Sequence, residues 1–534
     1  MDLKQRLFFL SLSTASASLL YLAWPALPFF PLIFVAFIPL CWINKALGVE
    51  RLHLWTFALY TYCALALFNI FTTWWVWNST PAGATFAMLV NALLMLVPWL
   101  AYRYTTVKLN MVWWSHFSLV PYFIAFEYWH LNWELSWPWL TLGNASAMYP
   151  ELIQWYEWTG VLGGSLWILT TNVFLFSSLV FYIEKQDAFK KTLRISLLVL
   201  FLPVFISLLR YVTYTEKGIE KEVVVIQPNI DPYTEKYSGS PRYIPYAEQY
   251  LRLENLTRGS ITKETAFVLW PETAFPDDFE EERATQNGMV QQLQTFSSQY
   301  PNTAFLVGAD TYRFFETPEN DGNIAYPIKE EGIYYTPYNT GVFIEKSNAP
   351  LFYHKSRLVP GVETLPYPHI FGFLTDNLGD LVVASVGKQK ERTPFVAKDS
   401  SAIVPIICYE SIYGAFLGEY VKQGAGLFFI ITNDAWWGNT PGHQQHFHYA
   451  RLRAIEHRKY IARAANTGIS GFIDQRGNIM DQSEYAKPCS MRKTILYNAK
   501  ATLYSLTGDV LGILAVLGTA GCGFILFKQR KKNV

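Results

Sequence analysis

The sequence is poor in charged residues and in cysteine. Charged residues make up 16% of the 534 positions, below the roughly 25% of ordinary soluble domains. The formal net charge is only +1, so the chain lacks the basic excess of nucleic-acid-binding proteins, and no nucleic acid is expected as a partner. The five cysteines form no CxxC pair and no Cys/His cluster, which leaves a zinc-binding domain without support.

Several common catalytic motifs are also missing. The sequence contains no GxGxxG, Walker A, HExxH or GxSxG pattern, so the usual nucleotide-binding, zinc-protease and serine-hydrolase interpretations lose support. The segment PGHQQHFHYA carries His443, His446 and His448, but no cysteine or acidic residue completes a ligand set by spacing. We interpret these histidines as polar packing or substrate-side contacts, and we expect neither a metal nor a cofactor.

Apolar residues, by contrast, are abundant. Hydrophobic residues make up 51% of the chain and aromatic residues 17%. Runs long enough to cross roughly 30 Å of hydrocarbon are expected to be membrane spans, at 7–23, 27–44, 54–73, 84–102, 112–129, 162–183, 195–212 and 509–527. Because further spans follow directly, the first run is interpreted as a retained anchor and not as a cleaved signal peptide.

This distribution predicts three parts of the chain. They are an N-terminal membrane domain with about seven transmembrane helices, a polar domain with the composition of a soluble protein, and a closing transmembrane helix with a basic tail, at 1–215, 216–500 and 501–534. Lysine and arginine gather in the loops after the second, fourth and sixth spans and in the tail KQRKKNV. The positive-inside rule therefore predicts that both termini face the cytoplasm and the polar domain the opposite side.

From Glu222 onward, short β-rich runs alternate with turn-rich and helical stretches. The runs expected to be buried strands are 223–229, 266–272, 304–310, 341–345, 402–410, 427–434 and 469–474. Several end in polar residues, at the place where α/β enzymes tend to bind ligands. Residues 448–466 are expected to form a helix with charge on one face. We assign no role to the long insertions at 277–300 and 364–400.

Three of the polar segments hold the residue types that acyl transfer needs. AFVLWPET contains Glu272, FYHKSRLVP contains Lys355, and AIVPIICYES contains Cys408. A carboxylate in apolar surroundings can take a proton from a thiol and return it, a fixed ammonium can stabilise an oxyanion, and a thiolate is a strong nucleophile. Taken singly, each also has an ordinary interpretation, as a strand-end acid, a solvated lysine and an inert buried thiol.

With these residues in view, the chain resembles the apolipoprotein N-acyltransferases, the membrane-bound branch of the nitrilase superfamily. Three motifs occur in that family's order: WPET around Glu272, HKSRLVPGVE around Lys355 and ICYES around Cys408. The segment WWVWNST at 74–80 and the segment 431–471 extend the resemblance over essentially the whole chain. The resemblance implies a multi-span α-helical membrane domain joined to an α/β domain with the αββα sandwich of the nitrilases.

The resemblance also implies roles for individual residues. Glu272 is expected to be the general base, Lys355 the oxyanion stabiliser and Cys408 the nucleophile. Supporting or substrate-binding roles are expected for Glu363, Tyr409, Glu410 and Asn339. The chain departs from the family at two places: residues 359–363 read VPGVE where VPFGE is common, and Tyr237 stands where the family has a tryptophan.

The function that the resemblance implies is a ping-pong acyl transfer. Cys408 is expected to take a fatty acyl chain, the sn-1 chain, from a phospholipid and to hold it as a thioester. The α-amine of the diacylglyceryl-cysteine of an apolipoprotein then accepts the chain, which gives a triacylated lipoprotein. The expected enzyme is a monomeric multi-pass protein of the bacterial inner membrane, with its catalytic domain on the periplasmic side.

Two other functions stay open on the sequence. A membrane-anchored nitrilase-like amidase would use the same three residues on a small C–N substrate and pass the acyl group to water, although seven spans are excessive for an anchor. A transporter or receptor with an inactive domain has little support, because all three residue types are present and charged residues are nearly absent from the spans. An acyl group on Cys408 separates this last class from the two enzymes, and the choice of acceptor separates the enzymes from each other.

Overall fold

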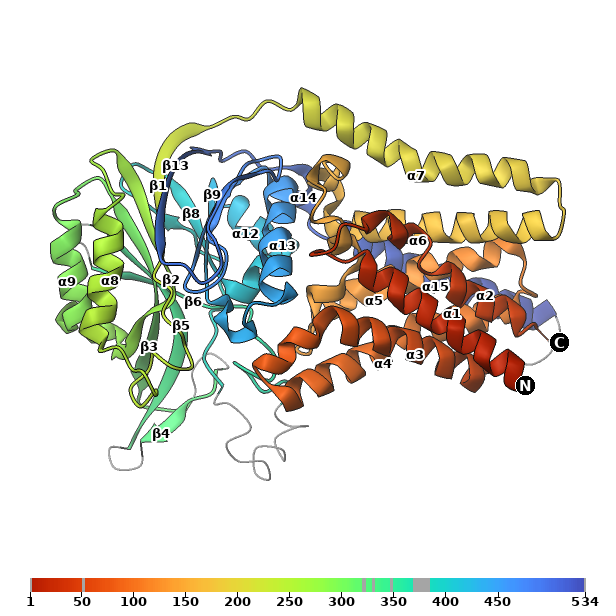
Figure 1. Cartoon of the computed structure of the whole chain (residues 1–534), viewed down its shortest axis with the longest axis horizontal. Helices are drawn as coiled ribbons and strands as arrows, with labels where there is room; N and C mark the ends of the chain where they lie inside the picture. Colours follow the sequence, from red (N-terminus) through yellow and green to blue (C-terminus); the bar gives the residue numbers. More distant parts are fainter. Residues whose placement is uncertain are drawn as a thin grey trace. The chain divides into compact units, whose positions relative to one another are not determined.

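The chain forms two compact units. The structure is a computed structural model that describes residues 2–49, 53–318, 323–328, 332–345, 349–367 and 385–532. One unit consists of Met1–Tyr214 with Thr507–Val534, and the other of Thr215–Leu506. The first is helical and the second contains the β-sheets (Figure 1). These bounds lie close to the three predicted parts, and part of the insertion at 364–400 lies outside the described residues.

The first unit consists of helices with little charge. They are α1 (Leu3–Leu22), α2 (Ile38–Ala46), α3 (Leu54–Thr73), α4 (Pro81–Lys108), α5 (Leu119–His130), α6 (Tyr156–Ile183), α7 (Ala188–Thr213) and α15 (Val510–Lys532). Within the described residues, five helical stretches are long and apolar enough to cross a membrane, namely Leu54–Asn78, Pro81–Lys108, Tyr156–Ile183, Ala188–Thr213 and Val510–Arg530. Each of the five coincides with an expected span.

The three remaining expected spans correspond to helical stretches outside this set of five. The helix α1 begins with a polar turn that includes Lys4 and Arg6, so only the rest of it is apolar. The second expected span corresponds to the short apolar stretch Phe30–Ala46. The fifth is divided between a 3₁₀ helix, Trp113–Ser118, and α5. The number of transmembrane helices therefore stays a prediction, with five of the eight supported by length and composition.

The second unit contains two β-sheets. The first sheet has the order β13-β1-β2-β3-β5-β4, with β6 paired to β5. Its strands are β1 (Ile219–Gln227), β2 (Thr265–Glu280), β3 (Ala304–Phe315), β4 (Tyr326–Ile328), β5 (Ile333–Glu345), β6 (Leu351–His354) and β13 (Cys489–Tyr497). The second sheet has the order β12-β11-β10-β9-β8-β7. Its strands are β7 (Phe395–Val396), β8 (Ala402–Ile407), β9 (Leu427–Thr432), β10 (Tyr460–Ala465), β11 (Gly471–Ile473) and β12 (Ile479–Gln482).

Helices cover the outer face of each sheet (Figure 1). The helices α8 (Tyr246–Arg258) and α9 (Gly288–Ser297) lie on the first sheet, and α12 (Gly414–Val421) and α13 (Pro441–His457) on the second. The sheets face each other, and the rings of Phe267 on β2 and Phe429 on β9 pack 5.1 Å apart between them. The predicted αββα sandwich is confirmed.

The alternation of side chains along β2 explains why the first part of this strand, at 266–270, is apolar throughout. Phe267 points between the two sheets, whereas Val268 and Trp270 join the buried cluster formed with Leu253 of α8 and Leu293 of α9. Successive residues of a strand point to opposite faces, and here both faces are covered. A strand in this position needs apolar residues at every step, as the sequence AFVLW provides.

The second half of the helix predicted at 448–466 is wrong. The helix α13 ends at His457, and the next residue, Arg458, takes a left-handed conformation with φ 52°. Residues Tyr460–Ala465 form β10 in the interior of the second sheet. The charge pattern misled the prediction because Arg463 is fully buried and bonds to Asp434 at 2.6 Å, so a buried strand carries a charged residue.

Polar residues collect where the parallel strands end. Cys408 directly follows β8, and Asn433 directly follows β9. These two strands are parallel neighbours, so their carboxyl ends lie at the same edge of the second sheet. Glu272 lies in the long strand β2, between Trp270 and Phe275, where the pairing with β3 shifts register. This irregularity frees the Glu272 segment from regular pairing, and the candidate site is built around it.

The contact between the sheets gives a test of the fold. Replacing Phe429, which is fully buried, by alanine is expected to lower the free energy of unfolding by about 3–5 kcal/mol, because the ring leaves a cavity between the sheets. Thermal melting of the full chain in detergent, followed by tryptophan fluorescence, measures the change. Leu251→Ala, at a side chain on α8 that is 52% exposed, is the matched control, and equal melting shifts for both variants would contradict the assignment.

Candidate active site

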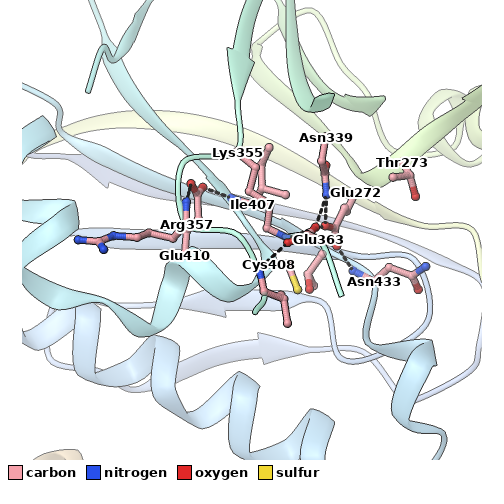
Figure 2. A network of polar contacts seen from close by, with 12 residues as sticks. Glu272, Thr273, Asn339, Lys355, Arg357, Glu363, Ile407, Cys408, Glu410 and Asn433 are labelled. Carbon is pink, nitrogen blue, oxygen red and sulfur yellow. Dashed lines mark hydrogen bonds and ion pairs between the residues drawn. The ribbon is translucent and has the colours of Figure 1, made fainter. Parts of the chain in front are cut away.

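The turn after β8 presents Cys408. The residue has φ 49°, a left-handed conformation that costs a non-glycine residue about 1–3 kcal/mol and is concentrated at functional sites. A short 3₁₀ helix, Cys408–Ile412, follows it directly. The side chain is 9% exposed and points toward Glu272 and Glu363 (Figure 2). The strained turn therefore directs the thiol into a polar cluster.

Glu272 receives hydrogen bonds on both oxygens. Lys355 Nζ lies 3.2 Å from Oε1, and the side-chain amide of Asn339 donates to the same oxygen at 2.8 Å. The backbone N–H of Asn433, which belongs to the other sheet, donates to Oε2 at 3.0 Å. These contacts fix the orientation of the Glu272 carboxyl group. Glu272 thus joins the two sheets at the edge where Cys408 emerges.

Lys355 lies between two carboxylates. Its side chain is only 1% exposed, and its Nζ approaches Glu363 Oε1 at 2.7 Å in addition to Glu272. Burial alone opposes the charged form of the lysine, but the two carboxylates outweigh it and hold the pKa of Lys355 well above its usual value. The lysine is therefore a permanent cation, as oxyanion stabilisation requires.

Glu363 is held in place by its own loop. Its Oε2 accepts the backbone N–H of Val359 at 2.8 Å, and its Oε1 accepts from Asn339 at 3.1 Å as well as from Lys355. The segment VPGVE, which departs from the common family pattern, therefore still directs its glutamate to the lysine. Gly361 supports the loop with φ 76°, a conformation that glycine adopts without strain.

The thiol of Cys408 is protonated at rest. Burial raises its pKa first, the charge of Glu272 raises it further, and the nearby Lys355 only partly opposes the two. A thiol of this kind is a poor nucleophile until a base removes its proton. Among the charged groups that act on the thiol, Glu272 has the largest effect, and its carboxylate can accept a proton, so the arrangement suits proton transfer coupled to attack.

Glu410 lies beside the cluster but points away from it. The carboxylate is fully buried. It accepts the backbone N–H groups of Ile407 at 2.8 Å, Ser356 at 2.6 Å and Arg357 at 3.2 Å (Figure 2). It also accepts the hydroxyl of Tyr353 at 2.7 Å. Glu410 therefore ties the loop after Lys355 to the turn of Cys408.

Tyr409 is also buried, and its ring packs edge-on against Tyr413 at 5.4 Å.

The sequence analysis predicts seven residues for this site: Glu272, Lys355, Cys408, Glu363, Asn339, Tyr409 and Glu410. The structure brings the first five into one polar cluster. Tyr409 and Glu410 lie in the 3₁₀ helix that begins at Cys408, and their contacts stabilise this turn rather than the cluster.

The sequence analysis interpreted His446 as polar packing or a substrate-side contact, but it did not identify the group of residues that holds the Cys408 backbone. The carbonyl of Cys408 accepts the hydroxyl of Ser411 at 2.7 Å and lies 3.2 Å from Nε2 of His446. The other ring nitrogen of His446 lies 3.0 Å from Asp434, which pairs with Arg463 at 2.6 Å. A single sequence gives little signal for this chain, because the four residues come from separate elements. The position of His446 fixes the carbonyl of Cys408, the residue with the left-handed backbone conformation.

The histidine segment does not form a metal site. His446 braces Cys408 as described, and the ring of His443 stacks on Tyr485 with centroids 4.4 Å apart. Burial lowers the pKa of His448 to about 3, with the charge of Arg451 adding to the effect. In the part of the chain that the structure describes, no group of three or more His, Cys, Asp and Glu side chains is placed to hold a metal ion.

Comparison with known proteins identifies the family of the chain. The family model for carbon-nitrogen hydrolases matches residues 236–508, which is more than half of the chain. The chain belongs to the carbon-nitrogen hydrolase family. A second model, for the N-terminal domain of apolipoprotein N-acyltransferases, matches residues 16–174. The two matches together confirm the resemblance of the chain to the apolipoprotein N-acyltransferases, the membrane-bound branch of the nitrilase superfamily.

Similar proteins cover most of the chain. An apolipoprotein N-acyltransferase of Chlorobaculum tepidum is 28% identical over 522 residues, which is 95% of this chain and 94% of that protein. One from Agrobacterium fabrum is 26% identical over 529 residues, 93% of each chain. Among solved structures, Nit3 of Saccharomyces cerevisiae, a member of branch 10 of the nitrilase superfamily, is similar over 55% of this chain and 97% of its own, with 14% identity and a TM-score of 0.36.

The contacts of Glu410 give a test of the site's support. Glutamine at this position has an amide NH₂ in place of one oxygen and cannot accept all the N–H groups, so Glu410→Gln is expected to cost about 1–3 kcal/mol of stability. Hydrogen–deuterium exchange at Ser356, Arg357 and Ile407 should become faster. Glu419→Gln, at an exposed carboxylate of α12, is the control. Unchanged exchange at the three amides would contradict the role given to Glu410.

Proposed function

We propose that the protein transfers a fatty acyl chain from a membrane phospholipid to the N-terminal amine of the diacylglyceryl-cysteine of apolipoproteins. The observation that carries this proposal is the cluster of a protonated thiol, a hydrogen-bonded carboxylate and a fixed ammonium at one edge of the sandwich. The names of the similar proteins, which match over up to 95% of the chain, supply the substrate class. No metal and no cofactor is required for this chemistry.

The first half-reaction forms a thioester on Cys408. Glu272 takes the thiol proton as the sulfur attacks the ester carbonyl of the phospholipid, the sn-1 ester in this proposal, and a C–S bond forms. The negative charge that develops on the carbonyl oxygen is stabilised by Lys355. The ester C–O bond then breaks, Glu272 returns its proton to the leaving alkoxide, and a lysophospholipid departs.

The second half-reaction passes the acyl chain to an amine. The neutral α-amine of the diacylglyceryl-cysteine attacks the thioester carbonyl, and Lys355 again faces the oxyanion. Glu272 accepts a proton from the attacking nitrogen and delivers it to the Cys408 sulfur as the C–S bond breaks. The products are an amide and a free thiol, so the enzyme returns to its starting state without net gain or loss of protons.

Asn339 and Glu363 have supporting roles in this scheme. Glu272 must change its charge during each half-reaction, whereas Lys355 must keep its own. Glu363 supplies a second carboxylate at 2.7 Å from the lysine, so Lys355 stays charged while Glu272 is protonated. Asn339 donates to both carboxylates and fixes their positions relative to each other. The site thus separates the group that exchanges protons from the group that stabilises charge.

The helices of the first unit suit an enzyme whose two substrates are both lipids. Helices of this length and hydropathy can hold acyl chains next to the protein in a bilayer. In this proposal the protein is a monomeric multi-pass protein of the bacterial inner membrane. The distribution of lysine and arginine supports cytoplasmic termini and a periplasmic catalytic unit. The alternative of a small-molecule amidase is not favoured, because the similar proteins match the helical part as well.

Intact-mass spectrometry tests the thioester. After incubation of the full chain with phosphatidylethanolamine and no acceptor, a fatty-acyl adduct is expected on the wild type and none on Cys408→Ala. Cys489→Ala is the control, because Cys489 is a free, half-buried cysteine of the same unit that should leave the adduct intact. An adduct on Cys408→Ala, or none on the wild type, would falsify the proposed function.

The oxyanion role predicts a rate effect. Lys355→Met keeps much of the side-chain volume but removes the charge, and it is expected to slow acyl-enzyme formation by a factor of about 10²–10³. Lys390→Met, at an exposed lysine of the same unit, should leave the rate unchanged. The rate is measured as the growth of the acyl adduct with time. A Lys355→Met rate close to that of the wild type would rule out this role.

A further inference from the structure

A second buried lysine lies on the other side of Glu272. Lys236, in the loop after β1, is 3% exposed, and its Nζ donates a hydrogen bond to the hydroxyl of Thr273. Its backbone carbonyl accepts from the side chain of Gln249 at 2.7 Å, and the same amide holds the carbonyl of Ile244 at 2.7 Å. The lysine is thus anchored to α8 and reaches the residue next to Glu272.

The residue that Lys236 holds is strained. Thr273 has φ 50°, which is an outlier for a β-branched side chain. The backbone of this segment also approaches Gly308 of β3 so closely that a Cβ there would lie 2.4 Å from the Pro271 carbonyl and 2.5 Å from the Cα of Glu272. The bend that aims Glu272 is therefore unfavourable by itself, and contacts from outside must hold it.

The charges around this bend are closely balanced. Asp310 on β3 pairs in register with Asn339 on β5, so both side chains project from the same face of the sheet. Burial raises the pKa of Asp310 to about 7, and Lys236 opposes that rise while Glu272 adds to it. Burial lowers the pKa of Lys236 to about 8, against the opposing charges of Asp310 and Glu272. The two groups therefore stabilise each other's charged forms.

Three carboxylates, those of Glu272, Asp310 and Glu363, face two ammonium groups, those of Lys355 and Lys236. If Lys236 were absent, the three carboxylates would share a single cation, and like charges at close range favour the uptake of a proton. The remaining titratable groups that act on Glu272 or on its neighbours Lys236 and Asp310 are Tyr237, Asp278 and Cys408. Glu272 is the member of this set that must be ionised to accept the thiol proton.

We propose that Lys236 is a positioning residue for Glu272: its bond to Thr273 holds the bend, and its charge offsets Asp310 so that Glu272 remains the ionised base. This inference rests on the proposed function, in which Glu272 takes the proton of Cys408. Lys236 does not touch Cys408 or the reacting atoms in this scheme. Its effect should therefore be seen in how the reactivity of Cys408 depends on pH.

Alkylation of Cys408 by iodoacetamide measures that dependence without any lipid. The full chain in detergent is labelled across a pH series, and the rate is read from the mass of the Cys408 peptide, since four other cysteines are free. In Lys236→Met the acid limb of the profile is expected to move to higher pH by about one unit, because Glu272 then binds its proton more tightly. Lys236→Arg should restore the limb.

Two matched variants separate the hydrogen bond from the charge. Thr273→Val keeps the shape of the side chain and removes its hydroxyl, which accepts from Lys236 and also bonds to Tyr237, so it should lower the plateau rate without moving the limb. Asp310→Asn removes a negative charge and should move the limb to lower pH, and the double variant with Lys236→Met should return it toward the wild type. If Lys236→Met does not fold, Asp310→Asn alone carries the test, and an unmoved limb overturns the inference.

The outcomes also separate this inference from the proposed function. A Lys236→Met variant that melts earlier and reacts more slowly at every pH, with its acid limb unmoved, would reduce Lys236 to a structural residue and overturn the inference. A shifted limb supports the inference even if phosphatidylethanolamine yields no acyl adduct on the wild type. The absence of the adduct would count against the proposed function and not against this inference, because alkylation reports on Glu272 and Cys408 directly.

Discussion

The structure of the site depends on one buried cation. Lys355 is almost completely excluded from solvent, and an unpaired ammonium in such a place would be very costly. The cost is offset only if carboxylates lie within hydrogen-bond distance, so Glu272 and Glu363 have to converge on the lysine. That requirement fixes the end of β6, the bend in β2 and the loop at 359–363 relative to one another. Asn339, which donates to both carboxylates, completes the constraint.

The second constraint is that the site draws on both sheets. Glu272 and Lys355 come from the first sheet, whereas Cys408 and Asn433 follow strands of the second. The bond from the Asn433 backbone to Glu272 therefore couples the register of one sheet to that of the other. Packing between the sheets, as at Phe267 and Phe429, sets the distance over which the proton must move. A sandwich that slipped by a small amount would keep every residue and lose the reaction.

Part of this could be predicted from the sequence, and the physical reason is clear. Lys355 and Cys408 directly follow strands, where polar groups are tolerated in α/β folds. Glu272, expected at the end of an apolar strand, instead lies within β2 at a register shift. Glu363 lies in the cluster although its loop departs from the common family pattern. Its carboxylate accepts the backbone N–H of Val359, a contact that does not depend on the side chains of the loop. Asn433 was missed, and the partners of His446, which was interpreted as polar packing or a substrate-side contact, were not identified, because these contacts join residues far apart in the chain. The strand β10 was taken for a helix because its arginine is buried and paired.

The resting state of the thiol explains why so much of the unit serves to position it. A thiolate stabilised in advance would attack with little dependence on its neighbours, but its attack on an ester would be weaker, because nucleophilicity falls as the pKa falls. Burial and the charge of Glu272 raise the pKa of Cys408, so in the proposed reaction attack and proton transfer occur together. Such coupling tolerates little misalignment. Three sets of contacts limit the movement of Glu272 relative to Cys408. They are the hydrogen bonds that Glu410 accepts, the contacts at the Cys408 carbonyl and the hydrogen bond from Lys236 to Thr273.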